Sequence, residues 1–351
     1  MLRGVAGPGI GREDGRASAL EVLLPLKRGG RVWLVLWLGL LRTSRPLRQR
    51  AFRELDELRF VYAIRWTLVP PFERARRPWM LRPEDRWQLL FQSNFDGDWD
   101  EYLENFASVM PKGLASLVWV GSGYTGLTSP DLFKRYAKAH DHLPEHYASA
   151  YVDLTAGDIR REIADRYGRG AAKAIHQGGY SEEALSWTNL VLPLRADRTG
   201  PAVRAARAME PPCVGDEEPT PLLLLSGAVH FARVVVLQLP TGSWLMITLT
   251  HDGKARPILA DALRRDREGD AEHPEPVLGP LLSHVLGVPH PDSPAWDDDR
   301  VLELLLAHRP RTRRHSLAYC AYPGFTVADI RALDAAPSRH DRYPSGDEQV
   351  S

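Results

Sequence analysis

The sequence contains a long-range internal similarity, which restricts the fold more than any other feature. Residues 150–160 and 321–331 share an Ala-Tyr pair, a Thr and an Asp-Ile-Arg triplet, all 171 residues apart. Three further matches keep the same order: 23–27 with 191–195 at a spacing of 168, 58–61 with 229–232 at 171, and 95–97 with 251–253 at 156. Four matches in one order at nearly constant spacing indicate a tandem duplication.

The duplication predicts two similar domains. We expect the first copy at residues 18–163, a linker at 164–186 and the second copy at 187–334. Residues 1–17 and 335–351 are polar and rich in Gly, Pro, Ser and Asp, so we expect disordered tails there.

Each copy has an expected order of elements. The expected strands are rich in Val, Ile, Leu, Phe, Tyr and Trp, and the helix after Asp98, its expected N-cap, has apolar residues at helical spacing. In the first copy we expect strands at 19–26, 58–69, 87–95 and 114–120, and helices at 31–42 and 98–110. In the second copy we expect strands at 188–194, 229–239 and 243–250 and a helix at 201–209. Both copies then add a helix (131–139; 299–308), a short strand (147–152; 316–321) and a helix that Thr155 or Thr326 opens.

The order β-α-β-β-α-β is that of the ferredoxin-like unit, a four-stranded antiparallel sheet with both helices on one face. The other face needs a cover, and two units in one chain can supply it by packing sheet against sheet. The predicted fold class is therefore α+β, with two tandem ferredoxin-like units packed sheet to sheet, each with a helix-strand-helix extension.

Composition excludes several classes of protein. The 351 residues include 45 basic and 45 acidic side chains, so no net charge attracts the chain to nucleic acid. The two cysteines, Cys213 and Cys320, form neither a disulfide framework nor a zinc motif, which favours a soluble protein of the cytoplasm.

One apolar run, residues 32–41, could be mistaken for a membrane anchor. Ten helical residues rise only about 15 Å, against roughly 30 Å for the core of a bilayer, so the run cannot span. We expect a buried helix; the alternative is that Trp33 and Trp37 contact a membrane surface or a partner, or that residues 31–42 mediate self-association.

The sequence resembles the dimeric α+β barrel superfamily, in which two ferredoxin-like units pair through their sheets. More closely it resembles uncharacterised bacterial proteins with an apolar-Pro-basic first strand (24–27), a His-Phe-Ala-Arg strand (230–233) and a Phe-Asp-Gly turn (95–97). The first copy has Arg-Phe-Val-Tyr at residues 59–62 instead, so a role for the imidazole and guanidinium would be asymmetric. Members of the superfamily include haem peroxidases, chlorite dismutases, cofactor-free monooxygenases, isomerases and ligand-sensing domains, so the resemblance does not select one function.

Two carboxylates, Asp96 and Asp252, are candidate catalytic groups because each precedes a Gly at the end of a strand. The favoured interpretation is a turn, since Gly adopts conformations that other residues resist and Asp accepts hydrogen bonds from nearby amides. His230, Arg233 and His251 are further candidates from neighbouring strands, with His230 or His251 as a general base or haem ligand. Alternation along a strand places His230 and Arg233 on opposite faces unless a bulge intervenes.

His140, His142 and His146 form the densest group of candidate metal ligands, alongside Asp141 and Glu145. A solvated loop is the favoured interpretation, and His140 at a helix C-terminus is also favourable against the helix dipole.

Three functions remain open. The leading one is a ligand-binding or non-catalytic protein with a small molecule between the sheets. The second is an oxidoreductase, either haem-dependent or a cofactor-free monooxygenase, and the third is a membrane-surface or partner-binding protein that acts through the Trp33/Trp37 helix. A cavity of several hundred cubic ångströms between the sheets would favour the first two.

Overall fold

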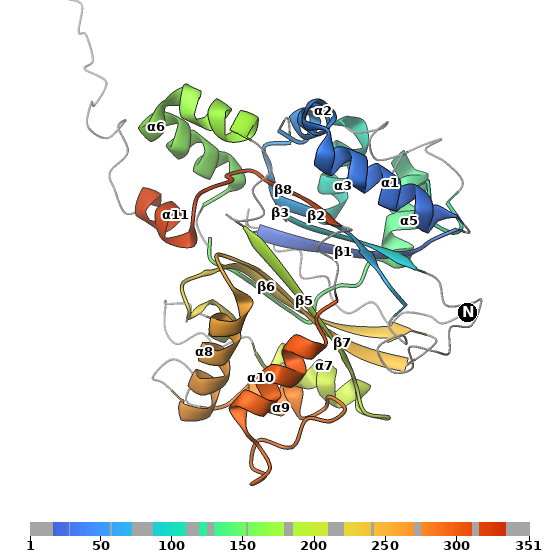
Figure 1. Ribbon diagram of the computed structural model, residues 1–351, viewed down its shortest axis with the longest axis vertical. Helices are drawn as coiled ribbons and strands as arrows, with labels where there is room; N and C mark the ends of the chain where they lie inside the picture. Colours follow the sequence, from blue (N-terminus) through green and yellow to red (C-terminus); the bar gives the residue numbers. More distant parts are fainter. Residues whose placement is uncertain are drawn as a thin grey trace, which may run out of the picture.

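The computed structural model contains two four-stranded antiparallel sheets, which pack face to face with helices on their outer sides (Figure 1). This arrangement confirms the predicted α+β class. The structure describes residues 17–27, 29–56, 58–71, 87–109, 119–124, 130–151, 154–178, 185–209, 221–239, 242–269, 275–310 and 316–334. The predicted tails lie outside these residues, except for Ala17, which begins the first strand.

The first half of the chain follows the predicted order closely. Its strands are β1 (Ala17–Pro25), β2 (Val61–Val69), β3 (Gln88–Asp96) and β4 (His146–Ser149). Its helices are α1 (Gly30–Thr43), α2 (Arg45–Asp56), α3 (Trp99–Val109), α5 (Pro130–His140) and α6 (Ala156–Gly178). Asp98 caps α3 as expected, because its Oδ1 accepts hydrogen bonds from the amides of Asp100 and Glu101 at 2.7 and 3.3 Å.

The second half has the same succession of strands. These are β5 (Ser186–Pro193), β6 (Val229–Leu239), β7 (Gly242–His251) and β8 (Ser316–Cys320). Its helices are α7 (Thr199–Arg207), the short 3₁₀ helix η2 (Leu222–Leu224), α8 (Ala255–Glu268), α9 (Leu278–Leu282), α10 (Asp298–Ala307) and α11 (Val327–Asp334).

The two halves exchange their fourth strands. The sheets have the orders β1-β3-β2-β8 and β4-β6-β7-β5, so β8 from the end of the chain pairs with β2, and β4 from the first half pairs with β6. The strand expected at 114–120 falls mostly outside the described residues. Residues 114–118 lie outside the described part, and Trp119 and Val120 form a turn.

The exchange of strands adds contacts between the two halves to those between the sheet faces. After β4 the chain continues as α6 and after β8 as α11, and both helices contribute to the core of the first half, through Ile159 and Ile163 of α6 and Ile330 and Leu333 of α11. These two helices contact each other at one end of the sheets (Figure 1). α6 continues to Gly178, through much of the segment for which a linker is predicted.

Each sheet is buried on both faces, which explains the nearly continuous apolar strands. One face packs under its own helices: Leu20, Val22 and Leu24 of β1 belong to the core beneath α1, α3 and α5. The other faces meet between the sheets, where Leu23, Val69 and Leu90 pack against Val191, Val235, Leu237, Trp244 and Met246. Among the described helices, none is both long and apolar enough to cross a membrane.

Candidate functional site

The two Asp-Gly turns hold corresponding places at the ends of β3 and β7. Gly97 and Gly253 both have positive φ, of 87° and 66°, which only glycine adopts readily. One oxygen of Asp96 accepts a hydrogen bond from the amide of Ala156 at 2.8 Å, and one oxygen of Asp252 accepts from the amide of Val327 at 2.9 Å. Each carboxylate thus binds the first turn of a helix, α6 or α11, where the helix dipole favours negative charge.

The threonines that open these helices behave as predicted. Thr155 Oγ1 accepts a hydrogen bond from the amide of Asp158, whose carboxylate accepts from the amide of Thr155 in return. Thr326 and Asp329 repeat this capping box at α11.

The second oxygen of Asp252 meets His230, which lies at a bulge of β6. The ladder between β6 and β7 shifts its register between Val229 and Phe231, so His230 is the residue at the irregularity. His230 Nε2 lies 2.9 Å from Asp252 Oδ1, and His230 Nδ1 is hydrogen-bonded to the Tyr151 hydroxyl. The result is a chain of hydrogen bonds from Tyr151 through His230 to Asp252.

Tyr62 occupies the place of His230 in the first sheet, also at a bulge, so the two strands correspond here at a spacing of 168 and not at the 171 that aligns Arg59 with His230. Its hydroxyl donates a hydrogen bond to Asp96 and lies 2.7 Å from the carbonyl oxygen of Leu154. The ring of Tyr62 stacks on Tyr151 as that of His230 stacks on Tyr322, with centroid distances of 6.1 and 6.0 Å. A buried aromatic cluster therefore joins the two Asp-Gly turns across the molecule.

Burial controls the protonation of this cluster. It raises the pKa of Tyr151 and Tyr322 well above 10, so both phenols keep their protons. It also raises the pKa of Asp96 to about 6, against the hydrogen bonds from Tyr62 and Ala156. The Tyr151, His230 and Tyr322 side chains are all buried, so the chain of hydrogen bonds positions elements rather than meeting a molecule from solution.

Arg233 does not join this cluster, because its side chain points between the sheets. Its guanidinium forms an ion pair with Glu21 of β1 at 3.0 Å and donates to Asn94 of β3 at 2.5 Å. Gln92 extends the network by donating to Glu21 at 2.8 Å and accepting from Asn189 at 3.1 Å. His230 and Arg233 have separate sets of partners, as expected for side chains on opposite faces of a strand. They do so even though β6 contains a bulge at His230.

The rest of this polar network, Glu21, Gln92, Asn94 and Asn189, is missing from the sequence-based candidates. The only signal for it is a charged or amide side chain inside an otherwise apolar strand, such as Glu21 between Leu20 and Val22. Such a residue must find a partner when buried. The sequence does not show that the partner lies on the opposite sheet.

His251 has both ring nitrogens engaged by protein groups. Nε2 lies 2.9 Å from Thr188 Oγ1, and Nδ1 lies 3.2 Å from the carbonyl oxygen of Asp252. Burial lowers its pKa to about 4. Because both nitrogens of His230 are engaged as well, neither histidine fits the role of a haem ligand without losing a hydrogen bond.

The three histidines of the candidate metal site have separate surroundings. His140 Nδ1 donates to the carbonyl of Tyr136, and the backbone amide of His142 donates to the backbone carbonyl of Glu21. His146 lies in β4 opposite Val234. Burial lowers the pKa of His142 and His146 to about 4. Within the described ranges, no three His, Cys, Asp or Glu side chains are grouped to hold a metal ion.

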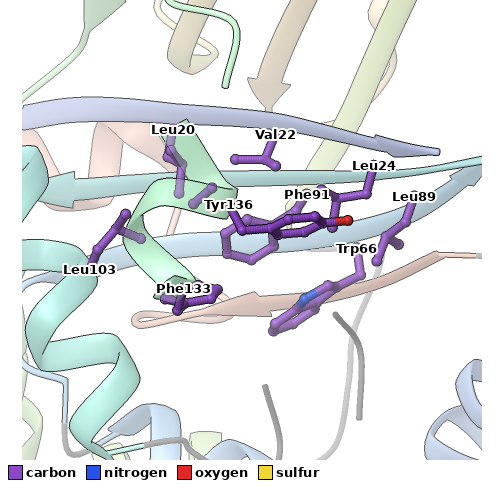
Figure 2. A pocket seen from close by; sticks show the side chains of 10 residues that line it. Leu20, Val22, Leu24, Trp66, Leu89, Phe91, Leu103, Phe133 and Tyr136 are labelled. Carbon is purple, nitrogen blue, oxygen red and sulfur yellow. The ribbon is translucent and has the colours of Figure 1, made fainter. Parts of the chain in front are cut away.

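A small cavity lies on the helical side of the first sheet, not between the sheets. It has a volume of about 30 Å³, and Figure 2 shows side chains of β1, β2 and β3 facing those of α3 and α5 around it. The lining residues are Leu20, Val22, Leu24, Trp66, Leu89, Phe91, Leu103, Phe133, Tyr136 and Ala137. All are apolar or aromatic, and the Tyr136 hydroxyl donates to the carbonyl of Ser122 at 3.1 Å.

The cavity lies beside Ala137, a small residue whose counterpart in the second half is large. α5 and α10 correspond at a spacing of 168 residues, since His140 and His308 both donate through Nδ1 to the carbonyl four residues earlier, each at 2.9 Å. At this spacing Ala137 of α5 corresponds to Leu305 of α10, which is buried in the second core. The first core therefore lacks an isobutyl group that the second contains.

Comparisons with known proteins add little to this geometry. No family model and no curated protein matches the sequence. Among solved structures, one of a protein of Fusobacterium nucleatum subsp. nucleatum ATCC 25586, named "Putative monooxygenase", is similar over 73% of this chain and 82% of that one. Its TM-score is 0.32 and its sequence identity 5%, and a similarity at this level carries no argument about function.

Proposed function

We propose that this chain is a non-catalytic binding protein for a small apolar molecule, which it holds between the first sheet and the helices α3 and α5. The observation that carries the proposal is the apolar cavity beside Ala137. Protein interiors are packed to near-crystalline density, and an apolar void stays dry and accepts apolar guests. Its volume of about 30 Å³ is small beside the roughly 150 Å³ of an engineered apolar cavity that binds benzene or xenon, so the guest is limited to one or two heavy atoms.

The chemistry of the other candidates supports a binding role over a catalytic one. Asp96 and Asp252 bind helix N-termini, His251 is bound to Thr188, and Arg233 is paired with Glu21. A catalytic group needs access to a substrate and freedom to change partners, and these groups have fixed partners in the fold. Membership of the dimeric α+β barrel superfamily is part of this proposal, supported by two antiparallel sheets packed face to face.

The test uses xenon, a monatomic apolar probe, observed through the methyl NMR signals of Leu20, Leu24 and Leu103. We expect saturable shifts of these signals in the wild type. Ala137→Leu should abolish the shifts, because the leucine side chain fills the cavity. Ala139→Leu, a matched substitution on the exposed face of the same helix, should leave them unchanged.

Two results would overturn the proposal. One is the absence of saturable shifts in the wild type. The other is equal binding by the wild type and Ala137→Leu, which would place the probe elsewhere. Circular dichroism and the melting temperature of each variant establish that the folded state is retained.

A further inference from the structure

Helix α1 exposes a line of aliphatic side chains on the outer surface of the molecule. Val32, Leu36 and Leu40 are 63%, 68% and 44% exposed, and their spacing of four residues places them on one face. Leu47 of α2 and Trp119, in the turn beside α1, are exposed as well. α1 and α2 lie on the side of the first sheet that faces away from the second (Figure 1).

This exposed line has no role in the core. The opposite face of α1 already supplies Leu34, Leu38 and Leu41, which are buried against the first sheet. A surface helix ordinarily turns polar residues outward. α1 instead has apolar residues outward, and a contiguous exposed apolar patch of this kind marks an interaction site.

Tryptophans border the line on one side. Trp33 and Trp37 stack with their ring centroids 5.7 Å apart, and Trp33 meets Trp119 edge to face at 6.3 Å. The ammonium of Lys27 lies 5.8 Å from the centre of the Trp119 ring. Indole rings are favoured at the boundary between water and lipid, because one side is apolar and the N–H remains polar.

Basic residues predominate in the sequence around the line, although the end of α2 also contains Glu54 and Asp56. Residues 27–50 contain seven basic residues and no acidic one. Arg31 and Arg42 lie near the two ends of α1, and Arg45 and Arg50 are exposed on α2. The rim is therefore basic although the whole chain is neutral.

We propose that the outer face of α1, with α2 and Trp119, docks on an anionic lipid surface. The aliphatic line would enter the interface in the plane of the membrane while the arginines meet lipid phosphates, as in surface-bound amphipathic helices. Charge selects this occupant over a second copy of the chain, because a symmetric dimer through α1 would bring two basic rims together. The inference is independent of the cavity and its ligand.

The test is co-sedimentation of the full chain with vesicles. We expect binding to vesicles of phosphatidylcholine with 30% phosphatidylglycerol, weaker binding to pure phosphatidylcholine, and loss of most binding at high salt. The triple variant Val32→Gln, Leu36→Gln, Leu40→Gln should reduce the bound fraction at least tenfold. The matched control is Leu286→Gln, which changes a leucine that is 49% exposed in the second half and should bind as the wild type does.

Other outcomes would overturn the proposal. Absence of wild-type binding to anionic vesicles, or equal binding by the triple variant, would do so. So would analytical ultracentrifugation showing a concentration-dependent dimer that the triple variant abolishes, together with no vesicle binding, since α1 would then be a self-association surface. Replacing Arg45 and Arg50 with Gln should weaken binding to anionic vesicles and leave the binding to neutral ones unchanged.

Discussion

Asp252 and His230 are joined by a hydrogen bond of 2.9 Å that fixes which ring nitrogen carries a proton. A carboxylate only accepts, so Nε2 donates to Asp252, and Nδ1 is hydrogen-bonded to the Tyr151 hydroxyl. We expect Tyr151→Phe to lower the free energy of unfolding by about 1–3 kcal/mol, because Nδ1 is left buried without this partner.

Urea denaturation measures this change, with Tyr167→Phe as a control. Tyr167 is exposed, and its substitution should change the free energy by less than about 0.5 kcal/mol. A Tyr151→Phe protein as stable as the wild type would show that the hydroxyl does not support His230.

The buried ion pair between Glu21 and Arg233 predicts a large loss in the free energy of unfolding when one partner is removed. Both side chains are buried between the sheets, and Arg233→Met leaves the carboxylate without its cation. We expect a loss of about 3–5 kcal/mol, whereas the double variant Glu21→Leu with Arg233→Met should be more stable than the single one. Arg256→Met at the exposed pair with Glu303 is the matched control and should cost at most about 1 kcal/mol. A double variant no more stable than Arg233→Met would contradict this account.

Asp141 predicts a pH dependence of stability. Its oxygens accept hydrogen bonds from the Glu21 amide at 3.3 Å and from Trp99 Nε1 at 3.0 Å, and burial raises its pKa from 3.8 to about 7. The folded chain then holds this proton more tightly than the unfolded chain. Its contribution to stability is complete below pH 4 and is lost as the pH rises through 7.

The check compares wild type with Asp141→Asn between pH 4 and 7.5. The free energy of unfolding of the wild type, minus that of the variant, should fall across this range by roughly 1.4 kcal/mol for each unit of pKa difference. Using the difference removes the opposite effect of His142, His146 and His251, whose lowered pKa values favour the folded state at higher pH. A constant or rising difference would show that Asp141 is not protonated in the folded protein at mildly acidic pH.

The sequence predicts the elements much better than it predicts their partners. β6 begins and ends where the apolar pattern predicts, and α5 and α10 begin and end within one residue of the expected bounds. Local alternation and helical spacing are enough to define such elements. The pairing of β8 with β2 depends on contacts between residues about 250 positions apart, and no local pattern encodes it.

For the candidate site as well, the sequence predicts local features but not contacts between distant residues. The Asp-Gly turns are predicted correctly because a positive φ at Gly97 and Gly253 is a local requirement. The bond from Asp252 to α11 and the pairing of Arg233 with Glu21 arise from the exchange of strands and the contact between sheets. The cavity depends on a difference between Ala137 and Leu305, which becomes visible only when two helices are compared in space.

The difference between Ala137 and Leu305 predicts opposite effects on stability when each is replaced by the other's residue type. Ala137→Leu should fill the first cavity and raise the free energy of unfolding by about 0.5–2 kcal/mol. Leu305→Ala should empty the corresponding position in the second core and lower it by about 2–5 kcal/mol. Urea denaturation of both variants measures these changes, and methyl NMR with xenon should show a new guest site near α10 in Leu305→Ala. If Ala137→Leu instead destabilised the protein by several kcal/mol, the space beside Ala137 would be too small for the side chain, and the correspondence of α5 with α10 would not account for the cavity.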